Sequence, residues 1–224
     1  MFMDKQLSKD KYSSPSQFLI LCVVTIGCLL TASQLHAETI LFSENFDAEN
    51  AGNGATNYDS FAQFSVPVGD VDLVGNGFAD FFPGNGLYVD LDGTGPMAGT
   101  LLSKDRFSLV AGEKYRIQFD LANSNDRFGG TVNENMLTVI VGNYFEEFTR
   151  NNLQAFETIT RVFTADDDAN ASLIFEHTGG DQLGILLDNI SLVAVPIPGV
   201  LWLFGVCTLG IARGTLRARK CAAT

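Results

Sequence analysis

The chain has 224 residues and a formal net charge of −12, with 46% hydrophobic and 18% charged residues. It is long enough for one domain with a buried core. Its acidic balance argues against binding to nucleic acid or to an anionic membrane surface, and it favours cations or neutral molecules as partners.

Residues 1–37 have the features of an export signal. A positively charged start is followed by a short apolar segment at 18–30 and by a small-residue cleavage site ending at Ala37. The sequence therefore predicts cleavage between Ala37 and Glu38. A retained transmembrane helix is less favoured because the apolar segment is short. A lipoprotein anchored at Cys28 is less favoured because an aliphatic residue is missing three positions before it.

Residues 38–194 differ in composition from the whole chain. Seven Lys and Arg stand against 24 Asp and Glu there, which gives a net charge of −17, and all four cysteines lie outside this segment. A domain of these 157 residues must fold without disulfides, and a chain of that size buries about 70% of its unfolded surface. We therefore predict one exported domain at 38–194.

This domain has the pattern of an all-β protein. Residues 114–121 alternate apolar and polar side chains, so one face of the strand should be buried and the other exposed. Turn-rich segments separate the candidate strands, and no long stretch has the 3.6-residue period of a helix. Strands are predicted at residues 40–46, 61–66, 86–91, 101–109, 114–121, 137–141, 156–163, 172–177 and 185–193. This spacing predicts an antiparallel jelly-roll-like β-sandwich.

Two carboxylates are in phase with the apolar residues of their strands. In the first strand Glu44 is two residues from Phe42, and in the last strand Asp188 is two residues from Ile190, so regular alternation puts each pair on the same face. Each carboxylate is then expected on the core face, where it is costly unless it is paired or coordinates a cation. The alternative is a β-bulge that turns either side chain to solvent.

Three further features could bind a ligand. Asp90 and Asp92, with Tyr88, form a possible ligand loop, although acids on an exposed strand face are the simpler interpretation. The aromatic segment 78–82 either stacks on a ligand or caps one end of the sandwich. Residues 166–170 begin like a calcium loop but lack its glycine, so we interpret them as an exposed turn.

Catalysis is not predicted. His177 is the sole histidine of residues 38–194, and without a cysteine these residues offer neither a Cys-His dyad nor a multi-histidine metal site. A two-carboxylate glycosidase is conceivable from the number of acids. However, the segment contains no tryptophan and little that suggests a substrate cleft.

The last thirty residues form a separate region. A Pro-punctuated segment at 195–198 precedes the apolar segment 199–212, which contains Trp202. The basic end that follows gives a stop-transfer pattern, because cationic side chains stay on the cytoplasmic side of a membrane. The 14 residues of this segment are fewer than the roughly 20 that span the hydrocarbon core, which favours a transient anchor. The basic residues are Arg213, Arg217, Arg219 and Lys220.

This tail resembles the PEP-CTERM sorting signal of bacterial envelope proteins. The matching parts are Val195-Pro196-Ile197-Pro198, Leu201-Trp202-Leu203-Phe204-Gly205 and the basic cluster. The resemblance implies recognition by an exosortase, a membrane-embedded cysteine transpeptidase, and removal of the anchor after export. Ile197 stands where the family has the glutamate of its Pro-Glu-Pro centre, so the tail is either cleaved in the same way or kept as an anchor.

Residues 38–194 also resemble exported sandwiches that often precede this tail and that are similar to carbohydrate-binding jelly rolls. Those jelly rolls hold a structural calcium ion partly through an acid of the first strand and an Asp of the last. The resemblance therefore implies calcium ligands at Glu44 and Asp188, with Asn45 or Asp47 supplying a further oxygen. The matching segments are residues 42–46, 71–73, 86–93, 109–115 and 186–192.

We therefore predict an exported, non-enzymatic β-sandwich, flanked by a signal helix and by a hydrophobic helix that anchors it in the membrane before processing. Its predicted location is the cell envelope, outer surface or extracellular matrix. Its expected partners are the export machinery, an exosortase and an exopolysaccharide, and no nucleic acid. Two functions remain open, a structural protein of the biofilm matrix and a carbohydrate-binding module, with a glycoside hydrolase less favoured.

Overall fold

A computed structural model describes residues 38–124, 135–150, 154–179 and 182–196. Thirteen strands and one short 3-10 helix, at Glu49–Gly52, occur in this part of the chain. In chain order the strands are β1 (Thr39–Glu44), β2 (Phe64–Val68), β3 (Asp72–Gly75), β4 (Leu87–Asp90), β5 (Thr100–Ser103), β6 (Phe107–Leu109), β7 (Lys114–Asn123), β8 (Asn135–Val141), β9 (Tyr144–Arg150), β10 (Gln154–Thr164), β11 (Ala169–Ala171), β12 (Leu173–Thr178) and β13 (Ile185–Val195).

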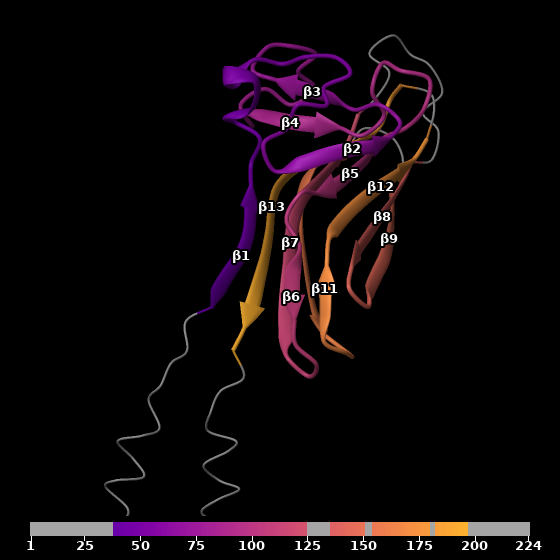
Figure 1. The fold of residues 1–224 in the computed structure, drawn as a ribbon. Helices are drawn as coiled ribbons and strands as arrows, with labels where there is room; N and C mark the ends of the chain where they lie inside the picture. The colour runs from indigo at the N-terminus through magenta and orange to yellow at the C-terminus, as the bar shows by residue number, and fades with distance from the viewer. Residues whose placement is uncertain (1–37, 125–134, 151–153, 180–181, 197–224) are drawn as a thin grey trace, which may run out of the picture. The chain divides into compact units, whose positions relative to one another are not determined.

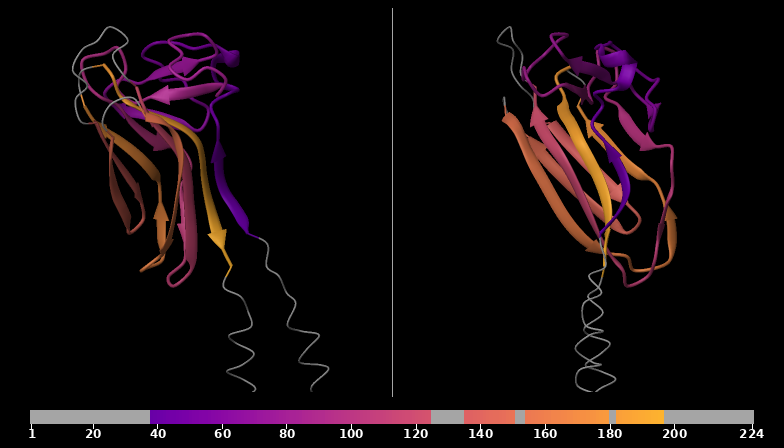
Figure 2. Two further views of the ribbon diagram at one scale, coloured as in Figure 1. Left: turned by 180° about the vertical axis from the view of Figure 1, so that it is seen from behind. Right: turned by 90° about the vertical axis from the view of Figure 1, so that its left-hand side faces the viewer.

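The strands form two main antiparallel sheets that pack face to face (Figures 1 and 2). One is a six-stranded sheet of order β10-β7-β13-β4-β3, in which β1 also pairs with β13, and the other is a five-stranded sheet of order β2-β5-β12-β8-β9. Strands β11 and β6 form a short additional sheet. The predicted all-β antiparallel sandwich is confirmed, and its finer assignment to the jelly-roll type stays a prediction.

The core lies between the two main sheets and is rich in phenylalanine. Strand β7 shows the predicted alternation, with Tyr115, Ile117 and Phe119 buried between exposed or half-buried polar residues. Phe119 contacts Phe148 and Phe175 of the five-stranded sheet edge to face, at ring-centroid distances of 5.4 and 5.5 Å. These aromatic contacts join the two sheets across the core.

The prediction of one strand at 101–109 is wrong, because the structure has two strands there, β5 and β6, which belong to different sheets. Strand β5 pairs with β2 and β12, whereas β6 pairs with β11. The polar sequence Lys104-Asp105-Arg106 separates them, and Lys104 Nζ donates to the carbonyl of Phe61. Strands β3, β9 and β11 were not predicted, and β11 begins within the segment 166–170 that was interpreted as a turn, although Asp166–Asp168 are exposed as expected.

A β-bulge changes the phase of the first strand. The register of β1 against β13 shifts between Ile40 and Phe42. Phe42 is therefore 4% exposed and lies in the core, whereas Ile40 is 69% exposed. Simple alternation across residues 40–46 is thus wrong at Ile40, because the extra residue turns that side chain outward.

A second bulge lies in the last strand. The register of β13 against β7 shifts between Asp188 and Ser191, and Asn189 has a positive φ of 47°. Leu187 and Ile190 both belong to the main core, so Asp188 lies on the other face of the sheet. The predicted phase of Asp188 with Ile190 is therefore wrong, yet the bulge does not expose Asp188, which is buried.

A smaller apolar cluster covers that other face of the six-stranded sheet. Tyr88 of β4 and Leu186 of β13 are buried in it, and Phe81 and Phe82 of the β3–β4 loop pack against them. The Tyr88 hydroxyl accepts hydrogen bonds from the backbone N–H groups of Phe81 and Phe82 at 2.7 and 3.0 Å and donates one to Asp80 at 2.9 Å. The aromatic segment 78–82 therefore caps part of the sandwich through these two residues.

Candidate functional site

Most residues that were predicted to direct export and sorting lie outside the described part of the chain. Of the predicted cleavage site, Glu38 is described, and its carboxylate forms two hydrogen bonds with Arg116 of β7, at 2.6 and 2.7 Å. No helix within the described ranges is both long and apolar enough to cross a membrane. The residues that lie outside are Ala37, Ile197, Pro198, Trp202, Arg213, Arg217, Arg219 and Lys220, and their roles stay predictions.

Four carboxylates come together near the end of β1. Glu44 is the last residue of β1 and Asp47 follows it, while Asp120 of β7 and Asp188 of β13 are register partners. We call these four residues the Asp188 group. Asp120 was not predicted from the sequence, because it lies on the polar face of β7. Nothing in the local sequence indicates that β13 places a second carboxylate opposite it.

Hydrogen bonds hold the oxygens contributed by the first strand and its loop. Glu44 Oε1 accepts from the backbone N–H of Phe46 at 2.8 Å, and Glu44 Oε2 accepts from Gln63 Nε2 at 2.8 Å. Asp47 Oδ1 accepts from the backbone N–H of Leu87 at 2.9 Å. Two of the four carboxylates are thus fixed by neutral donors rather than by cations.

Asn189 holds the other two carboxylates. Its side-chain amide donates to Asp120 Oδ2 at 2.8 Å and to Asp188 Oδ2 at 3.2 Å, and its backbone N–H donates to Asp188 Oδ1 at 2.7 Å. The positive φ of Asn189 at the bulge aims both groups at these acids. Asn45 has a similar place at the first strand, since its amide donates to Asp47 Oδ2 at 3.1 Å.

The electrostatics of the group favour a proton or a cation. Asp188 is 3% exposed. Burial raises the pKa of its carboxyl to about 8, and the charges of Asp47, Asp120 and Glu44 act in the same direction, against the hydrogen bond from Asn189. An ionised Asp188 is therefore disfavoured unless positive charge is supplied.

The donor atoms of this group suit calcium, which prefers carboxylate and amide oxygens. In the arrangement that the structure gives, however, no three Asp, Glu, His or Cys side chains among the described residues are placed to hold a metal ion. The chemistry of these residues fits the predicted ion. In the structure, however, their oxygens accept hydrogen bonds from N–H groups of the protein. Calcium binding through Glu44, Asn45, Asp47 and Asp188 thus stays a prediction.

The loop predicted to hold a ligand is buried. Tyr88, Asp90 and Asp92 are each at most 3% exposed, so the interpretation of the two acids as exposed is wrong. Asp90 Oδ1 accepts from the backbone N–H groups of Asp92 and Gly184 at 3.0 and 3.1 Å, which ties β4 to the segment before β13. Burial raises the pKa of Asp90, and the charges of Asp72 and Asp92 raise it further.

The outer face of the five-stranded sheet carries a row of apolar side chains that crosses it from strand to strand. The register aligns neighbouring members of the row on consecutive strands. The residues before and after them on β8 and β12, and Leu101 before Leu102 on β5, belong to the core. Phe145 is the most prominent member, at 60% exposed, and the others are half-buried. We call this set the apolar row: Leu102 of β5, Ile174 of β12, Ile140 of β8 and Phe145 of β9.

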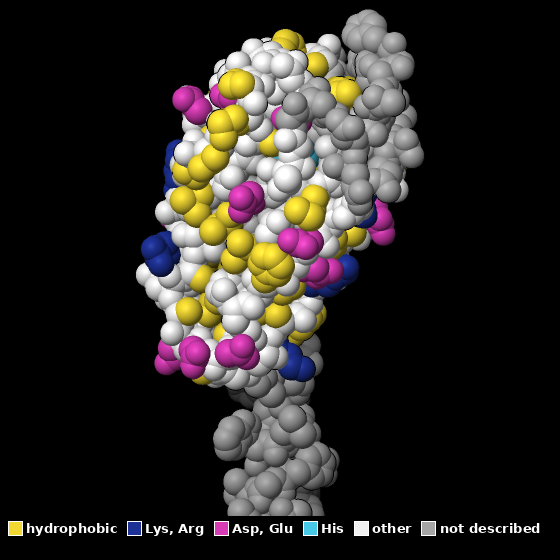
Figure 3. Space-filling view, turned by 90° about the vertical axis from the view of Figure 1, so that its right-hand side faces the viewer, with side chains coloured by type: hydrophobic (Ala, Val, Ile, Leu, Met, Phe, Trp, Pro, Cys, Tyr) yellow, Lys and Arg dark blue, Asp and Glu magenta, His cyan; other side chains and the backbone are white. Residues whose placement is uncertain are grey.

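A second row, one pleat further along the strands, carries two acids. Glu176 of β12 is aligned with Thr138 of β8, and Thr138 is aligned with Glu147 of β9. Both glutamates are exposed. Strand spacing places them about 10 Å apart and about 7 Å from the apolar row. We call Glu176, Thr138 and Glu147 the glutamate row. The side of the molecule that carries β8 and β9 shows hydrophobic side chains with acids among them (Figure 3).

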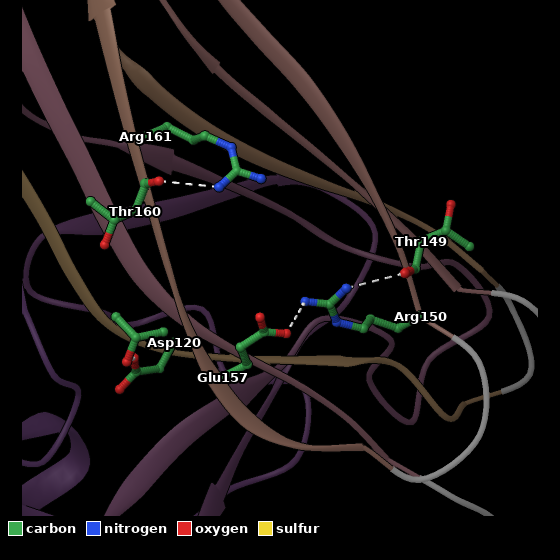
Figure 4. Close-up of polar contacts among 7 residues, drawn as sticks. Asp120, Thr149, Arg150, Glu157, Thr160 and Arg161 are labelled. Atoms are coloured by element: carbon green, nitrogen blue, oxygen red, sulfur yellow. Dashed lines mark hydrogen bonds and ion pairs between the residues drawn. The ribbon is translucent and has the colours of Figure 1, made fainter.

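The basic residues of this region are engaged elsewhere. Arg150 of β9 pairs with Glu157 of β10 at 3.2 Å, and Arg161 of β10 pairs with Glu146 of β9 at 2.9 Å. The first of these pairs bridges the edge strands of the two sheets in Figure 4. Among the described residues, no ion pair involves Glu147 or Glu176.

Comparison of the chain with protein-family models gives no match, and neither does comparison with curated proteins. Among solved structures it is similar to the K3 cleaved adhesin domain of Lys-gingipain from Porphyromonas gingivalis W83, with a TM-score of 0.43 and 14% identity over 70% of this chain and 99% of that chain. It is also similar to the CBM22-1 xylan-binding domain of Xyn10C from Paenibacillus barcinonensis, with a TM-score of 0.41 and 15% identity over 72% and 97% of the two chains.

Proposed function

We propose that the chain is an exported, non-enzymatic carbohydrate-binding protein that holds a polysaccharide against the outer face of its five-stranded sheet. The observation that carries this proposal is the apolar row. Sugar rings have apolar faces and polar rims, and sites for such ligands combine apolar or aromatic contacts with a few polar groups. The apolar row and the glutamate row offer this combination on one face.

The geometry of the row suits a chain-like ligand better than a compact one. The apolar row crosses four neighbouring strands of the sheet, from β5 to β9. Three steps between strands give a length of about 14 Å, and Ser65 of β2 continues the register beyond Leu102. Single exposed hydrophobic residues are common on protein surfaces, whereas an aligned set on one face indicates a contact surface.

A structural role in the biofilm matrix through self-association is the alternative. A second copy docked on the same face would bring its own Glu147 and Glu176 against those of the first copy. Four carboxylates without ion pairs would then share one interface, and such like-charge contacts are unfavourable. A polysaccharide has no such conflict, so it is the better occupant of this face.

Phe145 provides the test of this function. The full chain, purified in mild detergent, is applied to a glycan array, and bound glycans are then titrated with Phe145→Ala. We expect the variant to lose about tenfold or more in affinity, because the most exposed apolar contact of the row is removed. Val162→Ala is the matched control, since Val162 is exposed on the other sheet and should bind normally. Silence of the whole array, together with self-association that Phe145→Ala abolishes, supports the structural alternative instead.

Export and sorting form the second part of the proposal. We propose that residues 1–37 are removed at Ala37 and that an exosortase recognises the tail that begins at Val195. This rests on the resemblance of the tail and on the sequence features of the signal. In pulse-labelled cells we expect two shortenings, one at each end, and a new N-terminus at Glu38. A tail that persists at full length would show that Ile197 prevents processing and that the apolar segment is kept as an anchor.

A further inference from the structure

We infer that the polysaccharide bound on this face carries free amino groups, as a partly de-N-acetylated hexosamine polymer does. This inference rests on the proposed carbohydrate-binding function and adds the charge of the ligand. Its basis is the pairing of the apolar row with the glutamate row on one sheet face, which lacks a described cationic side chain to balance the two acids.

The two rows can act on one ligand because of their spacing. A sugar that stacks on Phe145 lies next to Glu147, two residues along the same strand, and a sugar near Ile174 lies next to Glu176. The two acids are separated across the sheet by Thr138. A polymer that follows the apolar row thus presents its substituents to both carboxylates, about 10 Å apart.

The charge of the surrounding protein selects among polysaccharides. Uronic acid polymers would bring carboxylates against Glu147 and Glu176 and are disfavoured. A neutral glycan gains only the apolar contact and hydrogen bonds. A glycan with protonated amino groups gains a charge-assisted hydrogen bond at each glutamate, and repetition along the polymer multiplies a gain that is small for a single exposed pair.

The arginines near this face do not compensate the two glutamates. Arg150 and Arg161 pair with Glu157 and Glu146 between the edge strands β9 and β10. By the alternation of β9, Arg150 lies on the face opposite to Glu147. Glu146 and Glu147 are adjacent on β9 but differ in this respect, since Glu146 accepts from Arg161 Nε and from the Tyr144 hydroxyl. Glu146 therefore stabilises the edge of the sandwich, whereas Glu147, on the opposite face of β9, is accessible to a ligand.

The test compares three ligands on the full chain in mild detergent. They are chitosan oligosaccharides, the same oligosaccharides after complete re-N-acetylation, and oligogalacturonides. In about 0.01 M salt we expect chitosan to bind about tenfold or more tightly than its re-acetylated form, and oligogalacturonides not to bind. In about 1 M salt, where the Debye length is about 3 Å, the preference should disappear.

Two double variants of equal charge locate the effect. Glu147→Gln with Glu176→Gln should abolish the preference for chitosan and keep binding of the re-acetylated form. Glu113→Gln with Asp166→Asn removes two exposed acids away from this face and should keep the preference. Equal loss in both variants would show a general effect of net charge and overturn the inference.

The remaining outcomes separate the inference from the function on which it rests. Equal binding of chitosan and its re-acetylated form would overturn the inference and leave carbohydrate binding intact. Binding of the re-acetylated form alone would overturn the inference in the same way. If no glycan binds at any salt concentration, both the inference and the proposed function fail.

Discussion

Without calcium, the wild-type chain should lose stability as the pH rises from about 5 to about 7, and Asp188→Asn should remove much of this loss. The pKa of Asp188 is raised from 3.8 to about 8 in the folded chain. Between these values the folded state holds a proton that the unfolded state has released, so its stabilising effect is complete below pH 4 and is lost toward pH 8. One proton corresponds to about 1.4 kcal/mol per pH unit, or about 3 kcal/mol over this range.

Thermal melts in a chelating buffer measure this effect. A change of about 3 kcal/mol corresponds to about 6–12 °C in melting temperature for a domain of this size. Some pH dependence should remain in Asp188→Asn, because burial also raises the pKa of Asp90. Asp166→Asn, an exposed acid, is the control and should keep the wild-type slope. An Asp188→Asn variant with the full wild-type slope contradicts the prediction.

Calcium provides a second arm of the same measurement. If the ion binds through the Asp188 group, it competes with the proton, so the melting temperature of the wild type should rise most near pH 7. The rise should be absent in Asp188→Asn and present in Asp166→Asn. If neither calcium nor chelator changes the melting temperature of the wild type, the predicted calcium site is contradicted and the pH prediction is unaffected.

The part of the fold that could be predicted comes from local alternation. In β7 the apolar residues follow a strict period of two, and the structure buries that face. The turn-rich segments separate most of the strands in the same way. Such signals are local, because the pleat of a strand alone determines which side chains share a face.

Other features could not be predicted because they depend on register. The sequence of β9 has aromatic residues on both faces, with Tyr144 and Phe148 inward and Phe145 outward, so its period is unclear. The bulge at Asn189 changes the phase of β13 without a proline or glycine to mark it. Local patterns do not contain this information.

The candidate sites also include a part that local alternation predicts and a part that depends on the register of the strands. Glu44 and Asp188 were singled out because a carboxylate in an apolar phase is unusual, and the structure does bring them near each other. The apolar row was missed, because its members come from four separate strands and each looks like an ordinary strand residue. Only the pairing of β5, β12, β8 and β9 aligns them. Surfaces of this kind are properties of the sheet rather than of any segment.

Replacing Phe119 by Ala should destabilise the domain by about 3–5 kcal/mol and lower its melting temperature by about 10 °C. Phe119 is fully buried on β7 and contacts Phe148 of β9 and Phe175 of β12 edge to face. Removal of the ring breaks both aromatic contacts. It also leaves a cavity between the sheets, because the backbones of two packed sheets cannot close around the space. Unfolding in urea, followed by circular dichroism, measures the loss.

Two controls distinguish a cavity from a general effect of truncation. Phe119→Leu keeps much of the volume and should cost less than half as much as Phe119→Ala. Val162→Ala shortens an exposed residue of the neighbouring strand β10 and should change stability by no more than about 0.5 kcal/mol. A Phe119→Ala variant as stable as Val162→Ala would mean that the sheets do not meet at Phe119. The outer face of the five-stranded sheet would then lack the rigid support that keeps the apolar row aligned across its strands.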